Sequence, residues 1–231
     1  ISVPEDSERS PEIFSGNRLY RNLAAGDGAF ADVSEFAGVR TGYWGWAGCF
    51  ADFNNDGYLD LFHVNGWSAF GFPEFSKDPS LLYVSNGDGT FTESSVDLGI
   101  DDVGQGRGVS CFDLDNDGDL DIFITNLSQP SKLFRNIGGN QGNFLSVRLR
   151  GLSPNTEAIG ARVYITTTGG EQMRELSMVS SYISQSPTIA HFGLADTETI
   201  DSLEIYWPDA EYTRIENLEA NQGILIEHPN L

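Results

Sequence analysis

Two nine-residue segments carry the residue types that bind a hard cation. Residues 52–60 (DFNNDGYLD) and 113–121 (DLDNDGDLD) both have oxygen side chains at positions 1, 3, 5 and 9, with glycine at position 6. Ca²⁺ takes about 6–8 oxygen ligands, and the glycine permits the sharp turn that brings the far end of the loop back. The spacing therefore predicts about two structural calcium sites. The predicted ligands are Asp52, Asn54, Asp56, Tyr58 and Asp60 in the first loop and Asp113, Asp115, Asp117, Asp119 and Asp121 in the second.

The loops differ from the helix-loop-helix calcium motif, which places a bidentate glutamate at position 12. Here position 12 is His63 in the first loop and Ile124 in the second. The residues after each loop form short apolar runs typical of buried strands. Asp60 and Asp121 are therefore expected to close their loops at position 9, where the chain enters a strand. The alternative is a turn rich in Asp, Asn and Gly that binds no metal, and two matching copies argue against it.

The loops belong to a longer repeat. Asp52 and Asp113 lie 61 residues apart, as do Gly26 and Gly87, which begin two Gly-Asp-Gly turns. Strand-like segments recur around both landmarks. All-β repeats of fixed period indicate blades of a propeller or turns of a solenoid.

Residues 17–22, residues 86–91 and the two loops resemble FG-GAP/VCBS-type repeats, the calcium-binding propeller repeats also found in integrin α-subunits. The resemblance implies a propeller-like fold with calcium in the loops. Propellers of this family usually have several more blades, whereas this chain has two clear repeats and the start of a third. Either the chain is the C-terminal part of a larger protein, or neighbouring chains complete the assembly.

The remainder resembles the ASPIC/UnbV domain of the cartilage-acidic-protein-like family. The segments that carry this resemblance are residues 158–163, 182–186, 191–194 and 206–209. The resemblance implies a secreted or cell-surface protein tied to adhesion and matrix, and it implies no common catalytic activity.

The predicted fold is all-β. Partial β-propeller-like repeats (two to three blades) over residues 17–137 follow an extended arm or linker at residues 1–16. About seven alternating strands over residues 143–228 predict a β-sandwich-like C-terminal domain. Residues 214–221 have a weak helical pattern, and we expect a strand and loop there.

The chain is strongly acidic. Asp and Glu number 34 against 13 Lys and Arg, for a formal net charge of −21. This charge argues against nucleic acid and anionic membranes as partners, and no apolar run approaches the roughly 18 residues of a membrane span. Without an initiating Met or a basic-then-apolar leader, the sequence is consistent with a removed signal peptide and an extracellular or cell-surface location.

Cys49 and Cys111 each lie on the strand that enters a calcium loop. They are offset by one residue between the repeats, which points them to opposite faces of their strands. A disulfide between neighbouring blades is open in an oxidising compartment, but we expect two buried thiols.

Features typical of an enzyme are scarce. The sequence contains His63, His191 and His228, but no nucleophile elbow, zinc-spaced histidine pair or phosphate loop, so no catalytic residue is assigned. His191 is expected to make a structural hydrogen bond. Asp27 and Asp88 suit the hairpin turns in which they lie and are second-rank metal candidates.

Aromatic residues cluster at residues 43–46 and 67–73. Packing between blades is the first interpretation, and a contact surface for a partner or glycan is the second. Asn126 begins an Asn-Leu-Ser glycosylation sequence, which matters only if the site is exposed.

These patterns predict a secreted, non-catalytic calcium-binding module for adhesion or recognition. Its partners would be a protein or glycan ligand, or other copies of the same chain. The main alternative is a self-assembling extracellular filament or surface-layer subunit that neighbouring chains complete. A third interpretation is a metal-dependent hydrolase, which would require an open coordination position and a nearby base.

Overall fold

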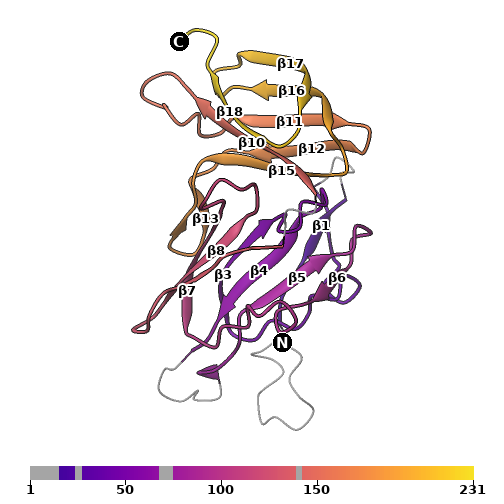
Figure 1. The fold of residues 1–231 in the computed structure, drawn as a ribbon. Helices are drawn as coiled ribbons and strands as arrows, with labels where there is room; N and C mark the ends of the chain where they lie inside the picture. Colours follow the sequence, from indigo (N-terminus) through magenta and orange to yellow (C-terminus); the bar gives the residue numbers. More distant parts are fainter. Residues whose placement is uncertain (1–15, 24–27, 68–74, 139–141) are drawn as a thin grey trace.

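The computed structural model describes residues 16–23, 28–67, 75–138 and 142–231, and these residues form strands and loops without an α-helix. A repeat region and a C-terminal domain are stacked on one another (Figure 1). The all-β fold is therefore confirmed. Within the described residues, no helix has the length and apolarity needed to cross a membrane. The predicted arm, except for Gly16, and residues 68–74 lie outside these ranges.

The repeat region contains three antiparallel sheets in which consecutive strands are neighbours, with strand orders β1-β2, β3-β4-β5-β6 and β7-β8-β9. This is the meander expected of propeller blades. The strands of the first two sheets are β1 (Tyr20–Asn22), β2 (Phe30–Asp32), β3 (Gly45–Ala51), β4 (Asp60–Asn65), β5 (Leu81–Ser85) and β6 (Phe91–Glu93). Those of the third are β7 (Gly106–Phe112), β8 (Asp121–Asn126) and β9 (Lys132–Phe134).

The strand register repeats with the period seen in the sequence. Cys49 pairs with Phe62 between β3 and β4, and Ser110 pairs with Phe123 between β7 and β8. Both members of the second pair lie 61 residues after those of the first. The described repeats thus comprise the β1-β2 hairpin, a four-stranded blade and a three-stranded blade, in agreement with the predicted two to three blades.

A hydrophobic core between the two larger blades packs β3 and β4 of one blade against β7 and β8 of the other. Phe62 and Val64 of β4 are fully buried, and they share this core with Val109 of β7 and Ile124 of β8. Alternation along each strand directs these side chains to the face that meets the neighbouring blade.

Cys49 of β3 and Cys111 of β7 form a disulfide, so the expectation of two free thiols is wrong. The one-residue offset explains the pairing. Successive blades stack with one face of a blade against the opposite face of the next. Side chains on opposite faces of equivalent strands therefore meet between the blades, and the two Cα atoms lie 6.9 Å apart.

The C-terminal domain is a sandwich of two sheets, with strand orders β15-β10-β18 and β12-β11-β16-β17. Strands β10 and β18 are parallel, and the other pairs are antiparallel. The strands are β10 (Asn143–Arg150), β11 (Arg162–Thr167), β12 (Gly170–Glu175), β15 (Ile189–Ala195), β16 (Thr199–Tyr206), β17 (Tyr212–Glu219) and β18 (Gln222–Glu227).

The inward residues of both sheets form one apolar core. Leu145 and Val147 of β10 and Phe192 of β15 are fully buried against Ile165 and Leu203 of the facing sheet. The predicted sandwich of about seven strands is confirmed, and β17 confirms a strand where the helical pattern was weak. The exact domain boundaries remain predictions.

Candidate metal centre

The two acidic loops have the same backbone. Position 4 is left-handed in both, with φ of 57° at Asn55 and 61° at Asn116. Position 6 also has positive φ, at 92° for Gly57 and 93° for Gly118. Asparagine and glycine tolerate this conformation better than other residues, so the sequence folds both loops alike.

The aspartate at position 1 organises each loop from within. The Asp52 carboxylate accepts hydrogen bonds from the backbone N–H groups of Asp56 (3.1 Å) and Gly57 (2.8 Å). The Asp113 carboxylate accepts bonds from the N–H groups of Asn116 (2.7 Å) and Gly118 (3.0 Å). Because these bonds wrap the chain around the carboxylate, positions 3 and 5 are brought back beside position 1.

The aspartate at position 9 closes each loop onto the blade. Asp60 accepts hydrogen bonds from Phe53 N (3.0 Å), at loop position 2, and from Ser85 N (2.8 Å), at the end of β5. In the second loop Asp121 accepts the equivalent bonds, from Leu114 N (2.9 Å) and from Asn136 N (2.8 Å) just after β9. These two predicted ligands therefore have a closing role that uses both carboxylate oxygens.

The second loop gathers three carboxylates at one point. One oxygen each from Asp113, Asp115 and Asp117 lies within 4.8 Å of the others. Oxygens that coordinate Ca²⁺ at 2.3–2.6 Å are at most about 5 Å apart, so this triad fits the ion. The triad includes neither Asp119 nor Asp121.

A guanidinium group lies against this triad. Arg135, directly after β9, contacts the Asp115 carboxylate and lies 3.5 Å from that of Asp117. It partly neutralises the loop, and it occupies one side of the carboxylates that a cation would use.

The first loop brings together positions 3 and 5. Asn54 Nδ2 donates to Asp56 Oδ2 (2.9 Å), and Asp56 N lies 3.3 Å from Asn54 Oδ1. Burial raises the pKa of Asp52 to about 7 and that of Asp60 to about 6, although backbone N–H groups oppose both shifts. A cation would favour the ionised carboxylates of this loop.

The side chains at position 7 turn away from the loop centres. Tyr58 is half-exposed, and Gly87 lies close to its ring. Asp119 is fully buried and accepts a hydrogen bond from Asn55 Nδ2 (3.3 Å). A ligand from position 7 would therefore be a backbone carbonyl.

Asn55 connects the two loops and the C-terminal domain. Its Nδ2 also donates to the carbonyl of Gly118 (3.1 Å) in the second loop. Its Oδ1 lies 2.8 Å from His191 Nε2, and its carbonyl accepts a hydrogen bond from Ala195 N (2.8 Å). Asn55 was not predicted from the sequence, because position 4 is not a ligand position. The recurrence of asparagine at position 4 of both loops was the available signal.

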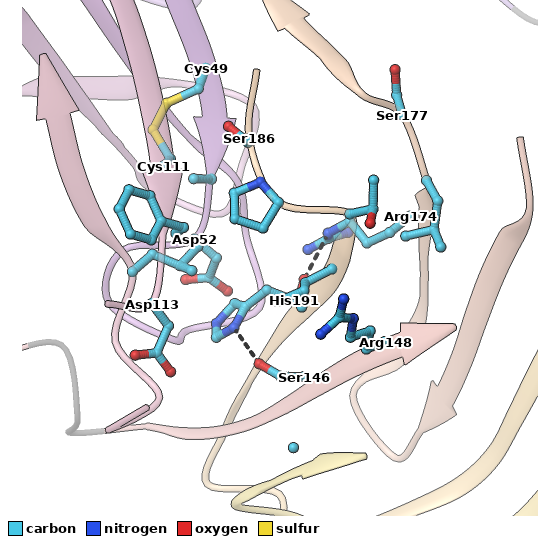
Figure 2. A pocket seen from close by; sticks show the side chains of 18 of the residues that line it. Cys49, Asp52, Cys111, Asp113, Ser146, Arg148, Arg174, Ser177, Ser186 and His191 are labelled. Carbon is cyan, nitrogen blue, oxygen red and sulfur yellow. Dashed lines mark hydrogen bonds between the residues drawn. A yellow bond between two sulfur atoms is a disulfide. The ribbon is translucent and has the colours of Figure 1, made fainter. Parts of the chain in front are cut away.

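His191 makes the structural hydrogen bonds that were expected. Its Nδ1 lies 3.2 Å from Ser146 Oγ (Figure 2), and its Nε2 makes the contact with Asn55. Burial first, and then the charge of Arg174, lowers its pKa to about 4, so the ring is neutral near pH 7. A neutral ring donates from Nε2 to Asn55 and accepts the Ser146 hydroxyl at Nδ1.

A second contact joins the C-terminal domain to strands β3 and β7 of the two larger blades. Strands β13 (Val179–Ser181) and β14 (Ser184–Gln185) form a hairpin of the C-terminal domain. Ser181 Oγ accepts a hydrogen bond from Gly48 N of β3 (2.8 Å), and Ser184 Oγ accepts one from Val109 N of β7 (2.9 Å). This hairpin, which overlaps the family segment at residues 182–186, therefore docks onto both blades.

The described aromatic residues stack on one another within the β3-β4-β5-β6 blade, and Arg107 of the next blade contacts one of them, so packing between blades is only part of their role. Trp67 stacks on Trp44 (5.5 Å between ring centroids) and on Trp46 (5.3 Å). Arg107 of β7 lies 4.1 Å from the Trp46 ring centroid, in cation–π contact. Residues 68–73 of the second aromatic segment lie outside the described residues.

Three polar predictions concern single side chains. Asn126 Nδ2 donates to Asp102 (3.0 Å) and to the Pro130 carbonyl (3.2 Å), so its amide is engaged within the chain. Asp88 caps its own turn by accepting a hydrogen bond from Thr90 N (2.9 Å). Asp27, its counterpart, lies outside the described residues.

Comparison with protein families agrees with this architecture. A model described as FG-GAP-like repeat matches residues 9–63 and 75–124, and one described as ASPIC and UnbV matches residues 151–231. The chain is therefore built from FG-GAP-like repeats followed by an ASPIC and UnbV domain, which confirms the resemblance seen in the sequence.

Curated relatives share the name Cartilage acidic protein 1. The human protein is 26% identical over 97% of this chain and 41% of its own length. The Xenopus tropicalis protein is 27% identical over 97% of this chain and 42% of its own length, and the Mus musculus protein is 29% identical over 78% and 28%. This chain thus spans less than half the length of the curated relatives it matches.

Proposed function

We propose that this chain is a secreted or cell-surface calcium-binding module that acts in adhesion or recognition, with calcium in a structural role. The observation that carries the proposal is the convergence of Asp113, Asp115 and Asp117 within 4.8 Å in a loop that has a second copy in the chain. Calcium held there would cancel the repulsion between carboxylates and rigidify the entry to β8, while the first loop would do the same for β4.

The extracellular location draws support from the disulfide between Cys49 and Cys111, because such bonds persist in oxidising compartments. The relatives named Cartilage acidic protein 1 support a matrix or adhesion setting. The net charge of −21 favours neutral or basic partners, such as a protein or glycan ligand, over nucleic acid.

A non-catalytic role draws support from the histidines. His63 and His191 are buried, and all four of their ring nitrogens have hydrogen-bonding partners, three of them asparagine side chains and the fourth the Ser146 hydroxyl. Burial lowers the pKa of each to about 4, which is poorly matched to general-base work at pH 7.

The proposal is tested by the binding of labelled protein to cell surfaces or cell-derived matrix, in calcium and in EDTA. We expect retention in calcium and its loss in EDTA or in the double variant Asp113→Asn/Asp115→Asn. Equal retention in all conditions would contradict a calcium-dependent recognition role. A parallel screen against ester, phosphate and glycoside substrates should show no turnover.

Assembly with other copies is the second candidate. In the described residues β9 is an edge strand of its sheet, and exposed apolar side chains lie on it and just after it, with Leu133 at 47% and Ile137 at 82% exposure. Unpaired edges of this kind can add a strand from another chain. Sedimentation velocity across a concentration series distinguishes the two: a monomer at all concentrations would remove this candidate.

A further inference from the structure

A cavity of about 620 Å³ opens between the calcium loops and the C-terminal domain, and the proposed function does not use it. Among the polar side chains that line it are those of Asp52, Asp113, Ser146, Arg148, Arg174 and His191 (Figure 2). The volume lies in the range of small-molecule sites, which are often found between domains.

Arg174 of β12 is a partly buried cation without an ion-pair partner. Its guanidinium donates to three neutral acceptors, the His191 carbonyl (3.0 Å), the Met173 carbonyl (3.0 Å) and Gln172 Oε1 (3.1 Å). Among the described residues no carboxylate lies at ion-pair distance from it; burial lowers the pKa of Arg174, and the charge of Asp52 opposes that shift. A guanidinium has five donors, so two remain that can bind an anion.

Arg148 supplies a second guanidinium to the same cavity. It lies on β10 with 61% of its side chain exposed, and its nearest carboxylate is that of Glu157, at 3.7 Å. An exposed pair of this length contributes little, so Arg148 can turn to a ligand at small cost. Two guanidinium groups that line one cavity offer the planar donor pairs that recognise carboxylates.

The remaining wall selects the kind of anion. Phe144, Leu176, Pro187 and Ile224 give the cavity an apolar side. Glu175, a carboxylate outside the two loops, also lines it, and its charge disfavours a doubly charged phosphate or sulfate. A singly charged acid with an apolar body satisfies both conditions.

We infer that this cavity binds a small monocarboxylate with an apolar body, held by the guanidinium groups of Arg148 and Arg174. The ligand is either a free acid or the C-terminal carboxylate of a peptide, since both present the same chemistry. The inference does not depend on the proposed adhesion role.

The test is a titration of the full chain, in excess calcium, with 3-phenylpropionate and with the corresponding amide. A second pair of probes is a tripeptide that ends in phenylalanine, with a free or an amidated C-terminus. We expect each acid to bind at least about tenfold more tightly than its amide, because the amide lacks the charge. Binding of the free acid indicates a metabolite site, and binding of the peptide acid alone indicates a partner's C-terminus.

Arg148→Gln should weaken acid binding about tenfold or more, and the matched control Arg150→Gln should not. Arg150 lies two residues further along β10, on the same face, with a similarly exposed side chain that does not line the cavity. Arg174→Gln tests the second guanidinium, with the folded state checked by circular dichroism. The inference would be overturned by equal binding of acid and amide, or by equal effects of Arg148→Gln and Arg150→Gln. It would also be overturned if no probe bound at up to about 10 mM.

Discussion

Asn55 Oδ1 lies 2.8 Å from His191 Nε2, and this contact joins the first acidic loop to the C-terminal sandwich. The same asparagine side chain donates to the Gly118 carbonyl in the second loop. The sandwich approaches the first loop so closely at Gly193 that no larger residue fits there, since a Cβ on Gly193 would lie 2.1 Å from Asp52 Oδ2. The folding of both loops and the docking of the sandwich are therefore energetically connected.

Replacement of Asn55 should destabilise the whole chain. Asn55→Gly keeps the left-handed backbone but leaves buried hydrogen-bonding groups of His191 and Gly118 without their partner, at a cost of about 2–5 kcal/mol in the free energy of unfolding. Urea unfolding at pH 7 measures the loss. The control is Asn116→Gly, the equivalent position of the exposed second loop, for which we expect a change under about 1 kcal/mol. Equal losses in the two variants would refute the connecting role of Asn55.

His63 should make the protein less stable in acid. The ring lies between Asn17 Nδ2 (3.2 Å) and Asn65 Oδ1 (3.1 Å), and burial lowers its pKa from 6.5 to about 4. The unfolded state then binds more protons between these two values, so stability falls as the pH decreases from about 6.5 to 4. At pH 5 the loss relative to pH 7 is on the order of 2 kcal/mol.

The measurement compares urea midpoints of wild type and His63→Gln at pH 7 and pH 5. Asp52 and Asp60 have raised pKa values and act in the opposite direction, because the folded state then binds more protons. They are present in both proteins, so the difference between the proteins isolates His63. The variant should lose less stability on acidification than wild type, and parallel losses would show that His63 does not titrate as described.

The fold was largely accessible from the sequence, because alternation and a 61-residue period are local patterns that burial enforces. The pattern of Leu145, Val147 and Leu149 predicted a strand of the sandwich correctly. The contacts between domains were not accessible. Asn55 and Ser181 act through partners 136 and 133 residues away, and a single sequence carries no signal for such pairings.

The disulfide between Cys49 and Cys111 was misjudged for a related reason, since the stacking of blade faces is a tertiary property. It closes a loop with a sequence separation of 62 residues, for which chain entropy gives about 4 kcal/mol of stabilisation. The double variant Cys49→Ala/Cys111→Ala should therefore show a lower urea midpoint, as should wild type in reductant. Reductant should not change the variant further. Identical midpoints with and without reductant in wild type would show that the bond is absent or without effect.

Arg135 should compete with calcium in the second loop. Its guanidinium contacts Asp115 and lies near Asp117, so a cation must displace it or share the carboxylates. Arg135→Gln should bind calcium about two- to fivefold more tightly by calorimetric titration, the range expected of an exposed ion pair. Arg18→Gln, which removes an exposed ion pair with Asp32, is the control and should leave the affinity unchanged. Weaker binding in Arg135→Gln would show that the guanidinium supports the site.

If calcium in the two loops holds the blades together, differential scanning calorimetry will give a higher Tm in calcium than in EDTA. At free calcium about 100-fold above Kd, each site adds about 2.7 kcal/mol, which corresponds to a rise in Tm of roughly 5–10 °C for a chain of this size. The double variant Asp113→Asn/Asp115→Asn should lose part of this rise and keep the part due to the first loop. A wild-type Tm that is the same in calcium and in EDTA would contradict the account.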